Sequence, residues 1–198
     1  MPEDGKASQL HPAEHRAYRE LYVSSRQLIN RWGRLTTALE GMPEAPVLEH
    51  AAGRVEDLLA ALSSRTGAYG LHGGPMALGL GARLADLRGA ITDRTVDTGM
   101  VMRFAVLDIE HVRTLLLHLG ALARARGDTG LAEFCGEWAD TVKPEVKAVR
   151  KAAVALGSSP DRAAAPIDDS LLGRTAHGVG WIFGAVGEGV DRATSRFR

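Results

Sequence analysis

Cysteine is nearly absent from this chain of 198 residues, which contains only Cys135. One cysteine cannot form an internal disulfide, and it cannot supply the several thiolates of a structural zinc site. Neither sign of charge is in excess, since 24 Lys and Arg residues balance 24 Asp and Glu residues. This balance argues against a nucleic-acid-binding protein, which normally carries a basic excess or a basic stripe.

Long apolar runs are also missing. The longest uncharged apolar run, around Gly178–Gly187, is well short of the roughly 20 residues that a membrane-spanning helix needs. The first residues, MPEDGKASQLHPAEH, are polar and do not resemble a secretory signal peptide. We therefore expect a soluble, cytoplasmic protein with no transmembrane segment. The hydrophobic fraction of 45% is nevertheless large enough for a packed core.

Apolar residues recur every three or four positions in four long stretches, which is the spacing of one face of an α-helix. The pattern predicts helices over residues 13–40, 45–65, 96–125 and 131–156, and a shorter helix over 76–91. No stretch of useful length alternates with a period of two, so strands are not expected. Two pairs of long helices with a long connection between the pairs are typical of a four-helix bundle with a crossover connection. The predicted fold class is all-α.

The composition divides the chain into four parts. Residues 1–12 are expected to be a flexible N-terminus, residues 13–157 the helical bundle, and residues 158–170 a linker. Residues 171–198 form a glycine-rich amphipathic tail with an apolar stripe at helical spacing.

The tail is expected to order only against another surface. Five glycines lie between Gly178 and Gly189, and each costs a helix about 1 kcal/mol relative to alanine. The expected anchors of this tail on a partner are Trp181, Ile182 and Phe183. The candidate partners are a groove of the bundle itself, a second subunit, another protein or a membrane surface.

Four short motifs occur in order along the predicted helices. They are LYVSSRQL at Leu21–Leu28, LEHAAGRVEDL at Leu48–Leu58, IEHVR at Ile109–Arg113, and a Gly127-Asp128 turn before the last helix. In this order and spacing, the chain resembles the bacterial stress-induced ferritin-like family of YciE/YciF type over about residues 16–157. The resemblance implies a ferritin-like dimer in which carboxylates and histidines from four helices hold two iron or manganese ions.

The chain departs from the family pattern at most of the implied ligand positions. Glutamates of the pattern fall on Ser25, His50 and Ala52, and its fourth-helix carboxylate pair falls near Thr141. The matching Glu110 and His111 belong to the IEHVR motif. We therefore expect no normal di-iron centre, and we expect Ser25, Ala52 and Thr141 to line the centre of the bundle.

The polar residues of the third long helix allow two interpretations. Asp108, His111 and His118 lie near one helix face because of their spacing, and with His50 they are candidate ligands of a remnant iron or manganese site. Alternatively, Asp108 accepts hydrogen bonds from His111 or from an arginine such as Arg113 or Arg103, since an unpaired buried carboxylate is costly. The second interpretation is favoured, so no cofactor is expected.

Two further groups are assigned on their helical positions. Cys135 falls on the inward stripe of its helix and is expected to act as a small hydrophobe rather than as a catalytic thiol. Several glutamates are expected on solvent-exposed helix faces: Glu49, Glu56, Glu133, Glu137 and Glu145.

These features together predict a non-catalytic or weakly metal-binding protein of a bacterial stress-response type. It is expected to act through protein–protein interaction, as a homodimer and without nucleic acid. Two alternatives stay open. One is an iron- or manganese-binding or oxidising protein with a rearranged site, and the other is a shell-cargo or membrane-surface module that works through the tail.

Overall fold

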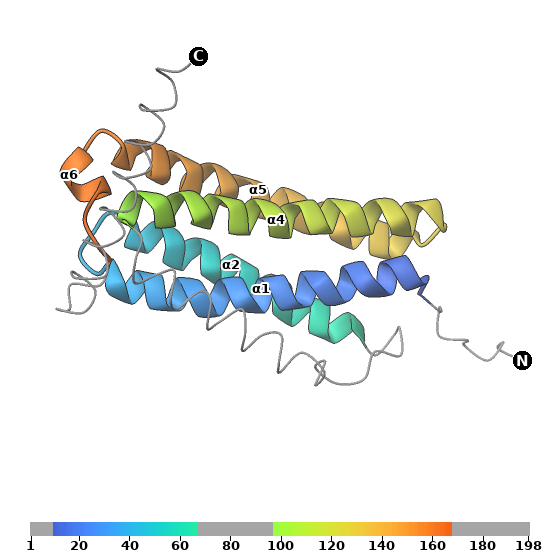
Figure 1. The fold of residues 1–198 in the computed structure, drawn as a ribbon. Helices are drawn as coiled ribbons and strands as arrows, with labels where there is room; N and C mark the ends of the chain where they lie inside the picture. The colour runs from blue at the N-terminus through green and yellow to red at the C-terminus, as the bar shows by residue number, and fades with distance from the viewer. Residues whose placement is uncertain (1–9, 67–96, 168–198) are drawn as a thin grey trace, which may run out of the picture.

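The computed structural model describes residues 10–66 and 97–167, and nothing is described for 1–9, 67–96 and 168–198. The helices are α1 (Pro12–Ala38), α2 (Ala45–Thr66), α4 (Thr98–Ala125), α5 (Thr129–Leu156) and the four-residue α6 (Pro160–Ala163) (Figure 1). In these two ranges there is no β-strand, and the one extended pairing is an isolated bridge between Asp97 and Pro166. The prediction of an all-α fold is confirmed.

Local sequence signals set the ends of the long helices. The main-chain N–H of His11 donates to Glu14 Oε2 at 2.7 Å, which closes a capping box at the start of α1. Asp128 accepts a hydrogen bond from the N–H of Leu131 at 2.9 Å at the start of α5. Gly41 and Gly127 have φ angles of +80° and +79°, which favour glycine and let the chain reverse after α1 and α4.

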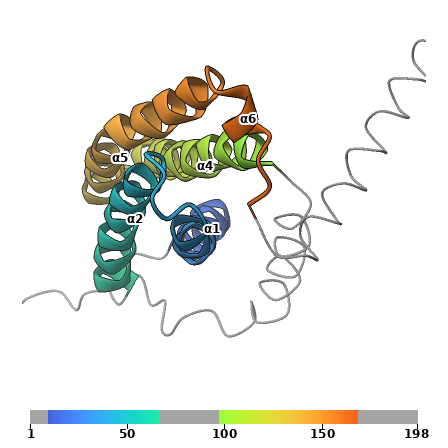
Figure 2. The same cartoon turned by 90° about the vertical axis from the view of Figure 1, so that its left-hand side faces the viewer.

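The four long helices form a bundle in which α1 packs against α2 and α4, while α5 packs against the same two helices (Figure 2). The Tyr18 hydroxyl near the start of α1 donates to the carbonyl of Leu62 near the end of α2. Glu14 at the start of α1 pairs with Arg126, which follows the end of α4. Both α2 and α4 therefore run antiparallel to α1 and parallel to each other.

The end of α2 and the start of α4 consequently lie at opposite ends of the bundle (Figure 1). Residues 67–96 join these two ends, as the single crossover connection of the prediction requires. The predicted short helix over 76–91 lies outside the described residues. None of the helices described here is long and apolar enough to cross a membrane.

The segment expected to be a linker packs against the bundle as far as residue 167. Two hydrogen bonds of 2.7 Å join Arg162 Nη2 to the two carboxylate oxygens of Glu44, in the turn before α2. The N–H and the hydroxyl of Thr98 both donate to the carbonyl of Ala165 at 2.9 Å. Ile167 also packs against the core, so the described chain ends beside the start of α4.

Candidate functional site

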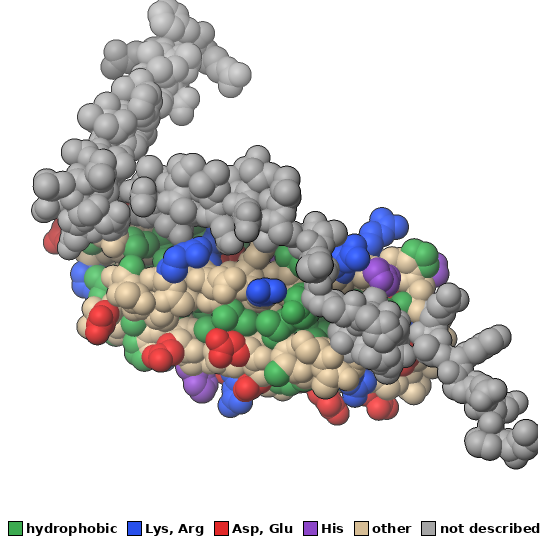
Figure 3. Space-filling model, turned by 90° about the horizontal axis from the view of Figure 1, so that it is seen from below, with side chains coloured by type: hydrophobic (Ala, Val, Ile, Leu, Met, Phe, Trp, Pro, Cys, Tyr) green, Lys and Arg blue, Asp and Glu red, His purple; other side chains and the backbone are tan. Residues whose placement is uncertain are grey.

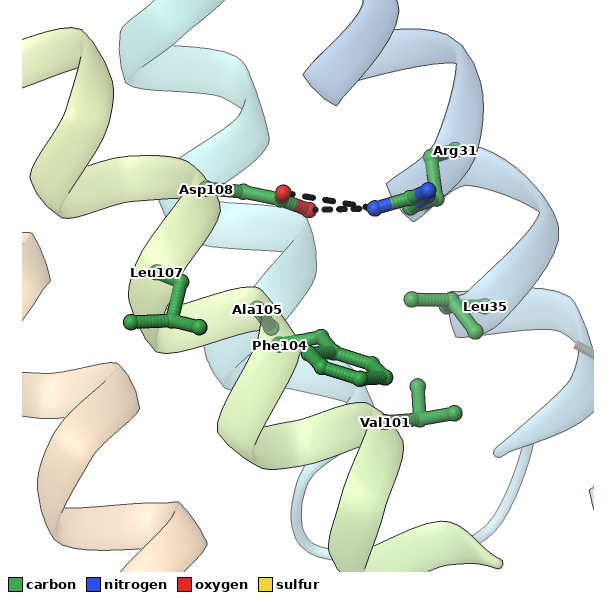
Figure 4. A pocket seen from close by; sticks show the side chains of 7 residues that line it. All are labelled: Arg31, Leu35, Val101, Phe104, Ala105, Leu107 and Asp108. Carbon is green, nitrogen blue, oxygen red and sulfur yellow. Dashed lines mark hydrogen bonds and ion pairs between the residues drawn. The ribbon is translucent and has the colours of Figure 1, made fainter. Parts of the chain in front are cut away.

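A groove between α1 and α4, which we call the α1/α4 groove, is the candidate site. It has a volume of about 260 Å³ and is lined by Arg31, Leu35, Val101, Phe104, Ala105, Leu107 and Asp108 (Figure 4). Phe104 points across the groove towards Leu35, and it is 40% exposed. Leu107 lies at the edge of the groove and is 63% exposed.

The groove brings two exposed large apolar side chains, Phe104 and Leu107, close together. In the described part of the chain, the exposed large hydrophobic residues are Phe104, Leu107, Leu117 and Val154. All four lie on α4 or α5. On the face that α1 and α2 form, charged side chains border a strip of hydrophobic side chains (Figure 3).

One end of the groove is polar. Arg31 Nη1 lies 3.3 Å and 3.1 Å from the two carboxylate oxygens of Asp108, and Trp32 Nε1 donates to Asp108 Oδ2 at 3.4 Å. The Trp32 ring is fully buried, and a buried indole N–H requires an acceptor. Asp108 supplies this acceptor, and the Arg31 guanidinium balances its charge. This explains how a carboxylate is accommodated beside the core.

The structure therefore gives Asp108 a protein partner, as the favoured interpretation of the sequence held. The partners are Arg31 and Trp32 of α1, neither of which the sequence interpretation named. Arg113 instead lies 3.7 Å from Glu110 and donates from Nε to the carbonyl of Ala139.

The histidines proposed as metal ligands lie on other parts of the surface. His50 Nε2 is 3.5 Å from Glu145 Oε1, across α2 and α5. His111 Nε2 is 3.7 Å from Glu20 Oε1, across α4 and α1. His118 is exposed.

The candidate ligands of the described ranges do not form one cluster. Within residues 10–66 and 97–167, no group of three or more His, Cys, Asp or Glu side chains is arranged to hold a metal ion. His50, Asp108, His111 and His118 are therefore not brought together. In addition, the Asp108 carboxylate is paired with the Arg31 guanidinium. A di-metal site would need several inward carboxylates that are free to bind the metal ions.

Ser25, Ala52 and Thr141 stand where the family pattern has metal ligands, and their environments differ. Ser25 is fully buried, and Ala52 is half-buried against the core. Thr141 is exposed, and its hydroxyl donates to the carbonyl of Glu137 at 2.8 Å. The prediction for Thr141 is wrong, and this removes the basis for calling the site a degenerate ferritin-like metal site.

Three buried carboxylates were not predicted from the sequence. Glu145, expected in solvent, is 7% exposed and contacts His50. Glu44 is buried in its pair with Arg162. Glu14 is 1% exposed, and its Oε2 lies 2.7 Å from Arg126 Nε. For Glu14 a signal existed, because it stands three residues after a helix-capping residue.

Cys135 is fully buried in α5, as predicted. Burial raises the pKa of its thiol from 9.0 to about 12, and the nearby Arg65 guanidinium offsets only part of this rise. A catalytic thiol needs a lowered pKa and partial exposure. Cys135 has neither property.

We predict that Cys135 of the folded protein reacts at pH 8 with a thiol reagent about a thousandfold more slowly than a free cysteine. The reason is that a pKa three units higher leaves about a thousandfold less of the reactive thiolate. Because the folded-state pKa is the higher one, ionisation of the unfolded thiol lowers stability only as the pH rises from 9.0 towards about 12. The measurement is labelling with and without denaturant, with the Cys135→Ala variant as the blank. Full labelling within minutes under native conditions would contradict the prediction.

No protein-family model matches the chain, and no curated protein or solved structure matches it either. Its function is therefore argued from its own residues.

Proposed function

We propose that this chain is a divergent ferritin-like bundle protein that acts through protein–protein contact rather than at a metal centre. The parallel direction of α2 and α4 supports the ferritin-like part of the proposal, because it requires one long crossover connection. A stress-type role and a homodimer are the further expectations that come with the resemblance.

The α1/α4 groove is the observation that carries the proposal. The acid that a metal site would use is bound by Arg31 and Trp32. Phe104 and Leu107 beside it are exposed. An apolar patch with a charged pair at its edge is typical of a surface that recognises another polypeptide, since aromatic residues supply contact area and polar groups fix orientation.

The first test is the metal content of protein purified without a histidine tag and incubated aerobically with iron. We expect well below roughly one ion per chain, because a two-metal centre needs about four inward carboxylates. Asp108→Asn should leave this low content unchanged. Two ions per chain with the visible absorption of an oxo-bridged pair would overturn the proposal.

The second test asks whether the groove contacts another protein in cells. A photo-crosslinking phenylalanine analogue is placed at Leu107 in the groove, or at the control position Val154, which is also exposed but lies on α5. The proposal expects a discrete crosslinked species from position 107 that is absent from position 154. Equal or no intermolecular adducts at the two positions would contradict it.

A further inference from the structure

We infer that the C-terminal tail of this chain docks in its own α1/α4 groove, with Trp181, Ile182 and Phe183 against Phe104 and Leu107. The inference rests on the groove of the proposed function but not on the existence of any partner. Its consequence is regulatory, because a partner that uses the groove has to displace the tail.

The tail begins beside one end of the groove. Pro166 forms the extended bridge with Asp97, and the carbonyl of Ala165 accepts two hydrogen bonds from Thr98. The described chain ends one residue later, at Ile167, which packs against the core. The first α4 residue that lines the groove is Val101, one helical turn past this attachment. The origin of the tail is therefore fixed at one end of the groove.

The chain between Ile167 and the anchors is long enough to span the groove. The stretch of α4 from Asp97 to Asp108 covers the length of the groove, and eleven helical residues rise about 16 Å. The chain from Ile167 to Trp181 can extend by up to about 46–50 Å. The anchors can therefore reach every part of the groove without any change in the bundle. Tethering also raises their effective concentration to the order of millimolar, so even a weak contact is populated.

The apolar residues of the tail match the exposed apolar side chains of the groove. The tail places three consecutive large hydrophobic residues in a glycine-rich sequence that forms a poor helix alone. The groove offers exposed Phe104 and Leu107 and a volume of about 260 Å³. This volume is just below the range of about 300–1,000 Å³ that is typical of small-molecule pockets. Such a volume fits part of the Trp181–Phe183 anchor, and the remaining side chains of the anchor would pack on the exposed Phe104 and Leu107 at the surface of the groove.

The test is disulfide trapping in the purified full-length chain. Leu107→Cys is combined with Ile182→Cys in a Cys135→Ala background, and the control pair combines Val154→Cys with Ile182→Cys. Val154 is a suitable control because it is exposed, and the end of α5 lies at the same end of the bundle as the start of α4. An undirected arm would therefore reach both positions alike.

We expect the intramolecular disulfide of the Leu107 pair to form at least about tenfold faster than that of the Val154 pair, as a higher effective concentration requires. Adding Phe104→Glu should remove this advantage, while circular dichroism verifies that each variant keeps its helices. Equal rates for the two pairs would overturn the inference. A disulfide that joins two chains would also overturn it, because the occupant of the groove would then be a second copy. Neither measurement depends on metal content or on crosslinks to other proteins, so the proposed function can fail while this inference holds.

Discussion

Replacing Arg126 with methionine is expected to lower the free energy of unfolding by about 2 kcal/mol, because it leaves the buried Glu14 carboxylate without its charged partner. This is below the range of about 3–5 kcal/mol for a fully buried ion pair, because the Arg126 side chain is 31% exposed. Arg126 Nε lies 2.7 Å from Glu14 Oε2, and Glu14 is 1% exposed. The methionine has similar bulk but no charge. The Glu14 carboxylate therefore stays buried, and it keeps the hydrogen bond from the N–H of His11 but loses its cationic partner. The loss is large because this pair joins the start of α1 to the end of α4.

Denaturant unfolding with a constant slope measures this loss, and two variants provide its controls. Arg124→Met removes an exposed arginine from the last turn of the same helix, and it should cost less than about 0.5 kcal/mol. Adding Glu14→Gln to Arg126→Met should recover part of the loss, because no unpaired charge is then left in the core. A cost for Arg126→Met no larger than that of Arg124→Met would show that the Glu14 carboxylate is not buried in solution.

The helices were largely predictable from the sequence because their signals are local. The expected helix over 13–40 corresponds to α1 at Pro12–Ala38, and that over 96–125 corresponds to α4 at Thr98–Ala125. Apolar residues at helical spacing, followed by a glycine in the left-handed conformation, indicate where such a helix ends. This signal does not depend on which other helices pack against it. The packing of α6 had no comparable signal, because it depends on Arg162 meeting Glu44, which is 118 positions away in the sequence.

The candidate site was less predictable because it depends on how helices face one another. Arg31 and Asp108 are 77 positions apart, and neither sequence neighbourhood indicates the other. Thr141 and Glu145 differ by only about 40° around a helix, yet Thr141 is exposed and Glu145 is buried. A short motif can place a residue on a helix, but it cannot fix the rotation of that helix to within this angle. The choice between these two residues therefore needed the packed bundle.

Trp32 is the residue on which the core and the groove both depend, and its replacement by alanine should have the largest effect of any single change discussed. The side chain is fully buried in α1, and its Nε1 donates to Asp108 at 3.4 Å. Truncation leaves a cavity and removes this donor, so we expect a loss of about 4 kcal/mol in the free energy of unfolding. Trp138 provides a matched control, because it is only half-buried, in α5. Trp138→Ala should cost less than half as much.

Trp32→Phe separates the two contributions of the indole. It keeps most of the ring volume but removes the N–H, while Arg31 still neutralises Asp108 at 3.1 Å. We therefore expect a loss of about 1–2 kcal/mol, close to that of one buried hydrogen bond with a small packing defect. If Trp32→Phe costs as much as Trp32→Ala, the hydrogen bond to Asp108 dominates and the carboxylate is the organising group of the groove. If Trp32→Ala costs no more than Trp138→Ala, the ring is not buried in solution, and the α1/α4 groove beside it would lose its structural basis.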